Sequence, residues 1–269
     1  PFGIEPDADQ LNVFLDVVFG YCEGLIPVRG FVDKGQGRDG KPNNIWIEAD
    51  ASAFDKLKTF ATWAWREGAA LYVIPGTVAA QGQARAHEVL QMQALVVDLD
   101  AGDIPAKLAH LVRYLGTPTL TVESGGRTPE GATKLHVWWK LTEAATGEHL
   151  ATLCRLRGDI AMKVGGDTHF RSAHQPIRVA GSVYYKNNLK TQVQIVEFNP
   201  DRERDLGEFI EAVADMPPAP EVRIIGRMRD TLIEALTTKE PGPKVIVASS
   251  ECMLNKQRRE KPLRAKAIK

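Results

Sequence analysis

The sequence of 269 residues has few cysteines, no excess of charge of either sign and no long apolar run. Its three cysteines, Cys22, Cys154 and Cys252, lie far apart and form no CxxC or cysteine–histidine cluster, which argues against a zinc site. No stretch approaches the roughly 20 apolar residues that a membrane-spanning helix needs, and no signal peptide is visible. We therefore expect a reducing, cytoplasmic setting and no membrane partner.

The charges of the chain balance, because Lys plus Arg and Asp plus Glu both number 34. A positive field over the whole surface, which would coat nucleic acid, is therefore excluded, although a local basic groove is compatible with these numbers. A hydrophobic content of 43% suits one large domain, or one and a half, with a sizeable core. The chain begins at Pro1 without a methionine, and we expect a processed protein or a piece of a longer one.

The spacing of apolar residues predicts helices and strands that alternate or lie in pairs, so we expect an α/β or α+β fold with a mixed sheet. Helical spacing covers residues 7–22, 51–68, 104–116, 146–165, 201–216 and 221–238. Strand patterns cover residues 24–32, 43–50, 70–76, 88–100, 119–124, 133–141, 176–185 and 191–198.

The character of the chain changes beyond Asn199, where only helical patterns follow. The run Pro-Pro-Ala-Pro at 217–220 is typical of a linker, and residues 256–269 are strongly basic and poorly patterned. We therefore expect a catalytic core over residues 1–199 and a helical segment with a basic tail over residues 200–269.

The strand predicted at 88–100 ends in Asp98-Leu99-Asp100. Residues i and i+2 of a strand point to the same face, so both carboxylates project together from the end of a buried strand. Two close carboxylates repel each other unless a cation lies between them, and hard oxygen ligands suit Mg²⁺ or Mn²⁺. The alternative is structural, with Asp100 or Asp103 capping the helix that follows, and this motif alone does not decide between them.

Two later segments favour a phosphate-binding site. The strand at 119–124 ends in Ser124-Gly125-Gly126, and a Gly-Gly turn lets the backbone come close to a phosphate. His136 lies on the neighbouring strand. Arg178 and Lys186 flank a turn of small residues further along, and both residue types bind phosphate, although solvated charges at a strand edge would look the same.

In this order, the motifs resemble those of the archaeo-eukaryotic primase superfamily. Within that superfamily the sequence is most similar to the primase-polymerases of plasmids, phages and integrated elements, including the RepB-type primases. It rests on the Asp-x-Asp pair, Ser-Gly-Gly followed by Leu-His-Val-Trp-Trp, a downstream Asp, and Arg-x-x-Gly-Ser-x-x-x-Lys, over roughly residues 25–198. The resemblance implies an α/β unit beside an antiparallel sheet like that of RNA-recognition motifs, with the active site between them.

The resemblance also implies roles for single residues. Asp98, Asp100 and Asp167 would be the catalytic ligands of two divalent ions, Mg²⁺ or Mn²⁺. The incoming NTP or dNTP would be bound by Ser124, Gly125, His136, Arg178 and Lys186. The expected activity is that of a DNA primase or polymerase, a nucleotidyltransferase that starts or extends primers on single-stranded DNA, with a replicative helicase as a candidate partner.

Further residues are candidates for contact with the template. Lys34, Arg38 and Lys41 lie in a predicted hairpin loop, where a solvated tip is an equal alternative. Trp138 is expected to share a face with His136 and to stack on a base, and either Tyr184 or Tyr185 to act as a gate near the sugar. Arg171 lies between two histidines in a polar loop.

Two other functions remain open at this point. A nuclease or relaxase would also use metal ions, although a relaxase requires a His-hydrophobe-His motif and Leu-His-Val-Trp-Trp has one histidine. A non-catalytic replication initiator module would bind nucleic acid without needing the three aspartates.

Overall fold

The computed structural model describes residues 3–32, 42–186 and 189–237, and shows a mixture of helices and mostly antiparallel strands. The helices are α1 (Ala8–Phe19), α2 (Ala53–Glu67), α3 (Ile104–Leu115), α4 (Gly147–Val164), α5 (Leu206–Asp215) and α6 (Pro220–Thr237), with the 3-10 turns η2 (Ala86–Glu88) and η3 (Thr168–Arg171). The strands are β1 (Leu25–Val32), β2 (Asn43–Glu48), β3 (Ala69–Val73), β4 (Thr77–Val78), β5 (Val89–Leu99), β6 (Leu120–Arg127), β7 (Thr133–Thr146), β8 (Ile177–Arg178), β9 (Val183–Lys186), β10 (Leu189–Gln192), β11 (Gln194–Phe198) and β12 (Glu203–Arg204). The expected α+β class is confirmed.

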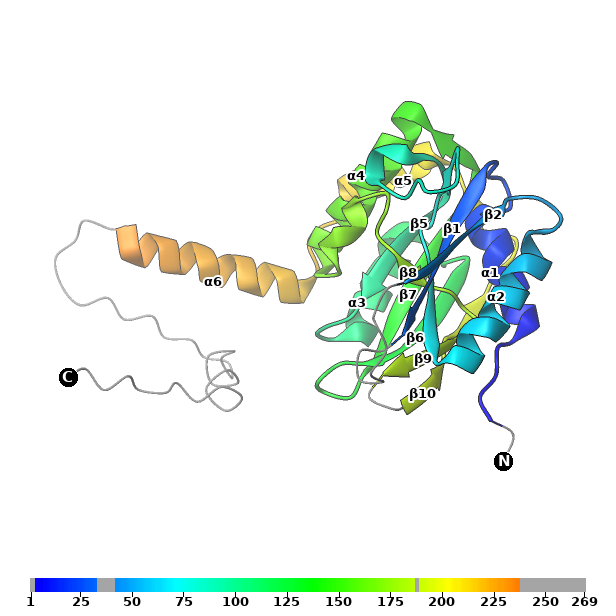
Figure 1. Cartoon of the computed structure of the whole chain (residues 1–269). Helices are drawn as coiled ribbons and strands as arrows, with labels where there is room; N and C mark the ends of the chain where they lie inside the picture. The colour runs from blue at the N-terminus through cyan, green and yellow to red at the C-terminus, as the bar shows by residue number, and fades with distance from the viewer. Residues whose placement is uncertain (1–2, 33–41, 187–188, 238–269) are drawn as a thin grey trace, which may run out of the picture. The chain divides into compact units, whose positions relative to one another are not determined.

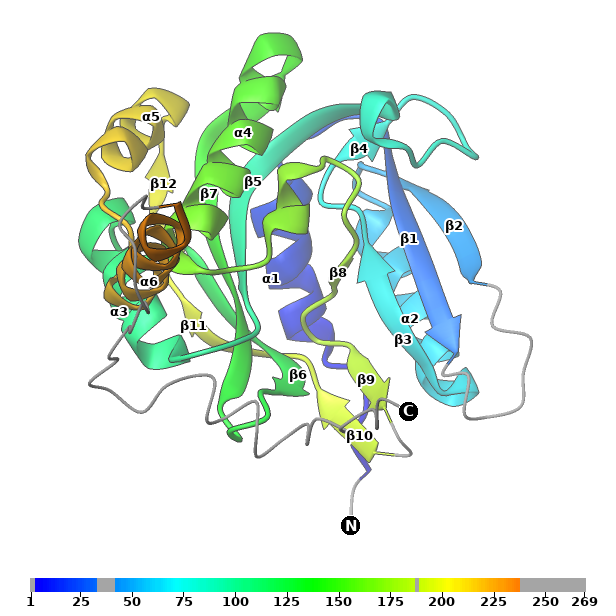
Figure 2. The same cartoon turned by 90° about the vertical axis from the view of Figure 1, so that its left-hand side faces the viewer.

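The strands of the described residues form one large sheet in the order β11-β6-β7-β5-β4-β1-β3-β8, with β2 paired to β1 and β12 to β7. Neighbours in this sheet run antiparallel, except that β12 runs parallel to β7. Strands β9 and β10 form a small sheet of their own. Figure 2 shows β5 and β7 on one side of α1 and β8, and β1 and β3 on the other, so the sheet bends around them.

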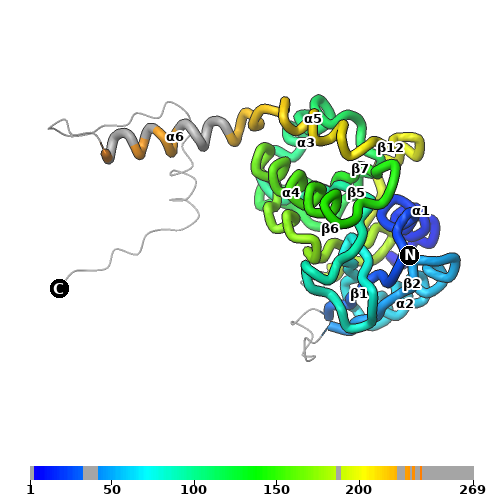
Figure 3. The backbone as a smooth tube through the Cα atoms, turned by 90° about the horizontal axis from the view of Figure 1, so that it is seen from above, coloured from blue at the N-terminus to red at the C-terminus, as the bar shows by residue number. Residues whose placement is uncertain are grey.

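The helices up to α5 cover the sheet from two sides. Helices α1 and α2 lie on the side opposite α3, α4 and α5 (Figures 1 and 3). Strand β5 contributes to both resulting cores, because Ala94 and Val96 belong to the cluster under α1 and α2, whereas Leu95, Val97 and Leu99 belong to the cluster under α3 and α4. An apolar run without alternation is what a strand buried on both faces requires.

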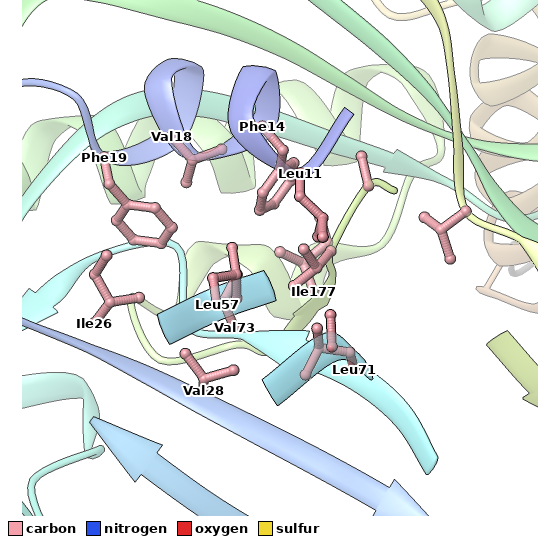
Figure 4. Packing of buried hydrophobic residues seen from close by; sticks show 14 of the residues in the cluster. Leu11, Phe14, Val18, Phe19, Ile26, Val28, Leu57, Leu71, Val73 and Ile177 are labelled. Carbon is pink, nitrogen blue, oxygen red and sulfur yellow. The ribbon is translucent and has the colours of Figure 1, made fainter. Parts of the chain in front are cut away.

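Helix α1 fills the inside of the bend in the sheet. Its side chains point toward those of β1, β3 and β8 (Figure 4). Phe14 of α1 meets the ring of Trp138 of β7 edge-on, with the ring centroids 5.6 Å apart. These contacts bring β7 and β8, which are far apart in the sequence, to the same core.

The ends of the helices follow from local residue chemistry. The Asp7 carboxylate accepts hydrogen bonds from the first amides of α1, and Asp103 accepts one from Ala106 at the start of α3. Helices α2 and α4 end at Gly68 and Gly165, which adopt left-handed conformations that suit glycine. The helix starting after Asp103 therefore begins directly behind the Asp98–Asp100 segment.

Two expected strands are divided in the structure. The segment 176–185 forms β8 and β9, because the backbone turns at Gly181, whose φ is +81°, and the Ser182 hydroxyl donates to the carbonyl of Val179. The segment 191–198 is divided between β10 and β11 at Val193, whose backbone pairs with Gly181 and Ser182. The turn returns the chain from β8 to a separate hairpin.

The first compact unit runs to Ala219 and includes β12 and α5, which packs against α3 and α4. It therefore extends past the division expected after residue 199, which stays a prediction about function. The second unit begins at Pro220 and contains α6, on which Leu232 and Ile233 are exposed. Of the helices in the described ranges, none is both long enough and apolar enough to cross a membrane.

Candidate active site

Asp98 lies directly opposite His136 where β5 pairs with β7. The carboxylate oxygen Oδ1 of Asp98 is 3.9 Å from Nε2 of His136. The next pair on the same face of these strands is Val96 with Trp138, and both side chains belong to the hydrophobic core. Asp100 follows the strand directly, and its side chain is 46% exposed. The polar residues therefore mark the point at which a buried apolar face meets solvent.

A cleft of about 200 Å³ opens over this pair. Its walls come from β3, β5, β6, β7, β8 and the segment around η3, which belong to both arms of the bent sheet. The lining residues are Tyr72, Asp98, Asp100, Ser124, Lys134, His136, Phe170, Gln175, Pro176, Ile177 and Arg178. Five of the residues that the sequence predicts for the site, from Asp98 to Arg178, are thus brought together here.

The carboxyl group of Asp98 is held in an environment that disfavours its charge. Its pKa is raised from 3.8 to about 7, chiefly because burial removes water from the carboxylate. The charges of Asp100 and Asp167 raise the pKa further, whereas the charges of Arg178 and Lys134 oppose them. A cation bound beside Asp98 would therefore displace a proton from it at neutral pH.

His136 is buried and neutral. Burial, with a smaller contribution from the Arg178 charge, lowers the pKa of its imidazole from 6.5 to about 3. Its approach to Asp98 is therefore not an ion pair at neutral pH. The ring lines the cleft, and its buried atom Nδ1 has no hydrogen-bond partner among the described residues.

Arg178 connects three strands at the wall of the cleft. Its Nη1 donates to the backbone oxygen of Ser124 at 2.7 Å, and its Nε donates to the hydroxyl of Tyr72 at 3.3 Å. The guanidinium also lies 3.8 Å from the centre of the Tyr184 ring. Gly125, at φ +79°, makes room for that ring, because a Cβ there would lie 3.2 Å from Tyr184. The guanidinium is thus held firmly while it lines the cleft.

Asp167 is joined to Asp98 through the backbone rather than through the side chains. Its amide donates to the carbonyl of Asp98 at 3.0 Å. Its own carboxylate caps η3 by accepting from the amide of His169 at 2.9 Å, and it lies 2.6 Å from Nδ1 of the same histidine. Gly166 permits this approach, since a Cβ there would lie 2.9 Å from the Asp98 oxygen.

The acidic residues fit a divalent cation that is shared with a substrate. Across the described ranges, no three His, Cys, Asp or Glu side chains form a ready-made metal cage. Asp98 and Asp100 nevertheless supply hard oxygen ligands, and their repulsion is of the kind that a cation relieves. Mg²⁺ is commonly held by one or two carboxylates together with substrate phosphates. Asp167 as a third ligand stays a prediction, because its carboxylate is turned to His169.

One expected DNA contact is wrong. Trp138 shares the face of His136, but it is 0% exposed and packed against Phe14, so it cannot stack on a base. Helix α1 covers this part of the sheet. Tyr184 stacks on Arg178 instead of standing free in the cleft, and its role as a gate near the sugar stays a prediction.

Other expected contacts lie outside the cleft or outside the described residues. Arg171 is exposed on η3, with its side chain running past Gly158 of α4. Lys34, Arg38 and Lys41 fall outside the described ranges, as does the side chain of Lys186 at the end of β9. Their proposed roles in binding nucleic acid or nucleotide stay predictions.

Lys134 and Tyr72 are among the cleft residues that the sequence reasoning missed. Lys134 lies two residues before His136 in β7, and its ammonium is 3.8 Å from the Asp100 carboxylate. The alternation of the strand, which puts both side chains on one face, was the available signal. Tyr72 is paired with Arg178 across β3 and β8, and no local pattern in the sequence shows this pairing.

The sequence matches no protein-family model and has no significant match among curated proteins. Solved structures of similar fold do exist. The primase-polymerase domain of cyanophage S-2L superposes with a TM-score of 0.57 at 16% identity, over 77% of this chain and 98% of that one. The catalytic domain of the primase RepB′, solved with initiator DNA, gives 0.52 at 15% identity, over 82% and 97%. A second structure of RepB′ gives 0.51 at 13%, over 86% and 69%.

The chain therefore has the fold of the archaeo-eukaryotic primase-polymerase domains, as the motifs led us to expect. At these identities the likeness shows the fold alone, and any activity depends on the residues of the cleft.

Proposed function

We propose that this chain is a templated nucleotidyltransferase, a DNA primase or primase-polymerase that makes or extends primers on single-stranded DNA. The observation that carries the proposal is the environment of Asp98. Its carboxyl has a pKa of about 7, and the charges of Asp100 and Asp167 both act on it. Arg178 and Lys134 line the same cleft. Acidic groups for cations and basic groups for phosphates are the two components that transfer of a nucleotide requires.

Asp98 and Asp100 would hold Mg²⁺ or Mn²⁺, with Asp167 as the proposed third ligand. When bound, the ions would lower the pKa of the attacking 3′-hydroxyl and would neutralise charge on the triphosphate. The residues of the chain do the rest of the work by positioning and by electrostatics. The pKa of Asp98 means that binding a cation there competes with a proton, so the site charges fully only above neutral pH or with the cation present.

Arg178 and Lys134 are our candidates for the triphosphate. The guanidinium is already held by Ser124, Tyr72 and Tyr184, so little conformational freedom is lost when it meets a phosphate. His136, whose imidazole is neutral, lines the same cleft and is a further candidate for contact with a phosphate oxygen. The single-stranded template and the NTP or dNTP substrates follow from this reaction as its partners, and a helicase partner is part of the same proposal.

A synthesis assay tests the proposal. The protein is incubated with single-stranded DNA, Mg²⁺ or Mn²⁺ and labelled nucleotides, with and without a primer, beside the variant Asp98→Asn/Asp100→Asn. Asp103→Asn is the matched control, because Asp103 lies in the same loop but caps α3, and asparagine also caps helices well. We expect products from the wild type and the control, and none from the double variant. Template binding without synthesis would instead support an initiator module, and cleavage of the template would support a nuclease.

A further inference from the structure

Lys107 of α3 is buried to an unusual degree for a lysine. Its residue exposure is 4%, although lysine is rarely buried fully without partners. Its ammonium donates to the backbone oxygen of Ala101 at 2.8 Å and to the backbone oxygen of Gly165 at 2.7 Å. The buried ammonium of Lys107 thus links two backbone segments, at Ala101 and at Gly165, that are far apart in the sequence.

The two pieces are those that carry the acidic residues of the cleft. Ala101 follows Asp100 directly, and Gly165 is two residues before Asp167. The same two segments meet again where the amide of Asp167 donates to the carbonyl of Asp98. The segment 98–101 and the segment 165–167 therefore form a junction that is held by two sets of contacts, those of the Lys107 ammonium and that of the Asp167 amide.

Repulsion between carboxylates disfavours this junction. The negative charges of Asp100 and Asp167 both act unfavourably on the carboxylate of Asp98. An ammonium donates in three directions from one compact centre, and hydrogen bonds from a charged donor are stronger than neutral ones. A planar guanidinium does not reproduce this geometry, nor does a neutral side chain reproduce its strength.

We propose that Lys107 is a positioning residue for the divalent-cation site, which it serves by clamping the loop after Asp100 to the turn before Asp167. The inference rests on the proposed function, because it needs the acidic residues to bind a cation. Lys107 acts through backbone oxygens and is not itself a ligand. Groups that orient the ligands of a metal typically affect its affinity by about 10- to 100-fold.

Lys163 of α4 offers a matched control. Its ammonium also donates to two backbone oxygens, those of Val213 at 2.5 Å and Met216 at 2.7 Å. That clamp joins α4 to the end of α5, and neither acceptor segment contributes to the cleft. The two lysines therefore make the same kind of contact, one at the acidic residues and one away from them.

The test is Mn²⁺ binding to the full chain, followed by the loss of the electron paramagnetic resonance signal of free Mn²⁺, without nucleotide or DNA. We expect Lys107→Met to bind Mn²⁺ about tenfold more weakly than wild type, or worse. Lys163→Met should bind as wild type does, although both variants lose stability. Lys107→Gln, which keeps a polar but uncharged donor on a shorter side chain, should also bind weakly.

Each outcome decides the matter. If Lys107→Met binds Mn²⁺ as tightly as Lys163→Met, the proposal is overturned while the proposed function stands. If Lys107→Met does not fold, Lys107→Gln takes its place in the comparison. If neither folds and Lys163→Met does, Lys107 supports the whole domain rather than the site, which also overturns the proposal. If the wild type binds no Mn²⁺ here but makes product in the synthesis assay, this inference is overturned and the proposed function stands; if it does neither, both are overturned.

Discussion

Asp98 and His136 face each other across β5 and β7, 3.9 Å apart, and their pKa values are moved in opposite directions from their ordinary values. Burial favours the neutral form of each group, so the carboxyl takes up a proton more readily and the imidazole less readily. The pair can therefore be neutral near pH 6 without exchanging a proton. Its two members should have opposite effects on how stability depends on pH.

The signs follow from linkage. The pKa of Asp98 is raised when folded, so its contribution to stability is present below pH 3.8 and is lost as the pH rises to about 7. The pKa of His136 is depressed, so its contribution is present above pH 6.5 and is lost as the pH falls to about 3. Between roughly pH 4 and 6.5 the two groups change the free energy of unfolding with pH in opposite directions, each by up to about 1.4 kcal/mol per pH unit, so their effects cancel.

Single variants should expose the two contributions. Relative to wild type, the free energy of unfolding of Asp98→Asn should rise with pH over this window, and that of His136→Gln should fall. Urea denaturation in the presence of a metal chelator at pH 4.5, 5.5 and 6.5 measures both differences. Differences of the same sign for the two variants would contradict the assigned environments.

Arg178 should contribute chiefly to nucleotide binding. Lysine in its place keeps the charge but loses the stacking on Tyr184 and the fixed directions of donation to Ser124 and Tyr72. We expect Arg178→Lys to raise the KM for the nucleotide by about 10- to 100-fold, since one charge-assisted hydrogen bond contributes roughly 1.5–3 kcal/mol.

A second arginine provides the control for this prediction. Arg204 donates to the backbone oxygen of Leu115 at 2.6 Å and lies 5.0 Å from the centre of the Phe209 ring, away from the cleft. Arg204→Lys should lower stability and leave the KM unchanged. An equal rise of KM in both variants would mean that Arg178 acts only through the fold.

Gly166 should be essential for the junction of the acidic segments. An alanine Cβ there would lie 2.9 Å from the carbonyl oxygen of Asp98 and would push apart the hydrogen bond from Asp167. We expect Gly166→Ala to weaken Mn²⁺ binding as well as synthesis. Gly76→Ala is the matched variant, since its Cβ would lie 2.7 Å from the backbone oxygen of Gln91 outside the cleft. Similar Mn²⁺ affinity in the two variants would contradict this account.

Trp138 should matter for folding and not for DNA. Its complete burial against Phe14 means that Trp138→Ala should cost about 3–5 kcal/mol of stability. Trp138→Phe should bind single-stranded DNA as wild type does, like Trp139→Phe, whose tryptophan is buried on the opposite face of β7. Weaker DNA binding by Trp138→Phe alone, measured by fluorescence anisotropy, would restore the stacking interpretation.

Trp138 and Asp98 show which features of the site can be predicted from the sequence and which cannot. Alternation along a strand predicts correctly which residues share a face, and it placed His136 with Trp138. The pairing of β5 with β7, which brings Asp98 opposite His136, is beyond it. Alternation also does not predict what covers that face. Helix α1, more than 100 residues earlier in the chain, covers Trp138 and leaves Asp98 beside the cleft.

The remaining features depend on contacts between distant segments. The turn at Gly181 divides an apolar run that reads as one strand, because its amide pairs with Val193. Tyr72 reaches the cleft only through the pairing of β3 with β8. Lys107 lies within a regular helical pattern, and its role depends on two backbone oxygens that no sequence pattern marks. The helices and most strands were predictable because their signals are local.

The most direct test of the central claim is the identity of the first nucleotide that the protein adds. A primed DNA whose next template base is A, C, G or T is offered each nucleotide singly, with Mn²⁺, to wild type and to Asp98→Asn/Asp100→Asn. We predict that the wild type adds the complementary nucleotide in each case and that the double variant adds none. Addition that ignores the template base, or addition that survives loss of both carboxylates, would contradict templated synthesis at this site.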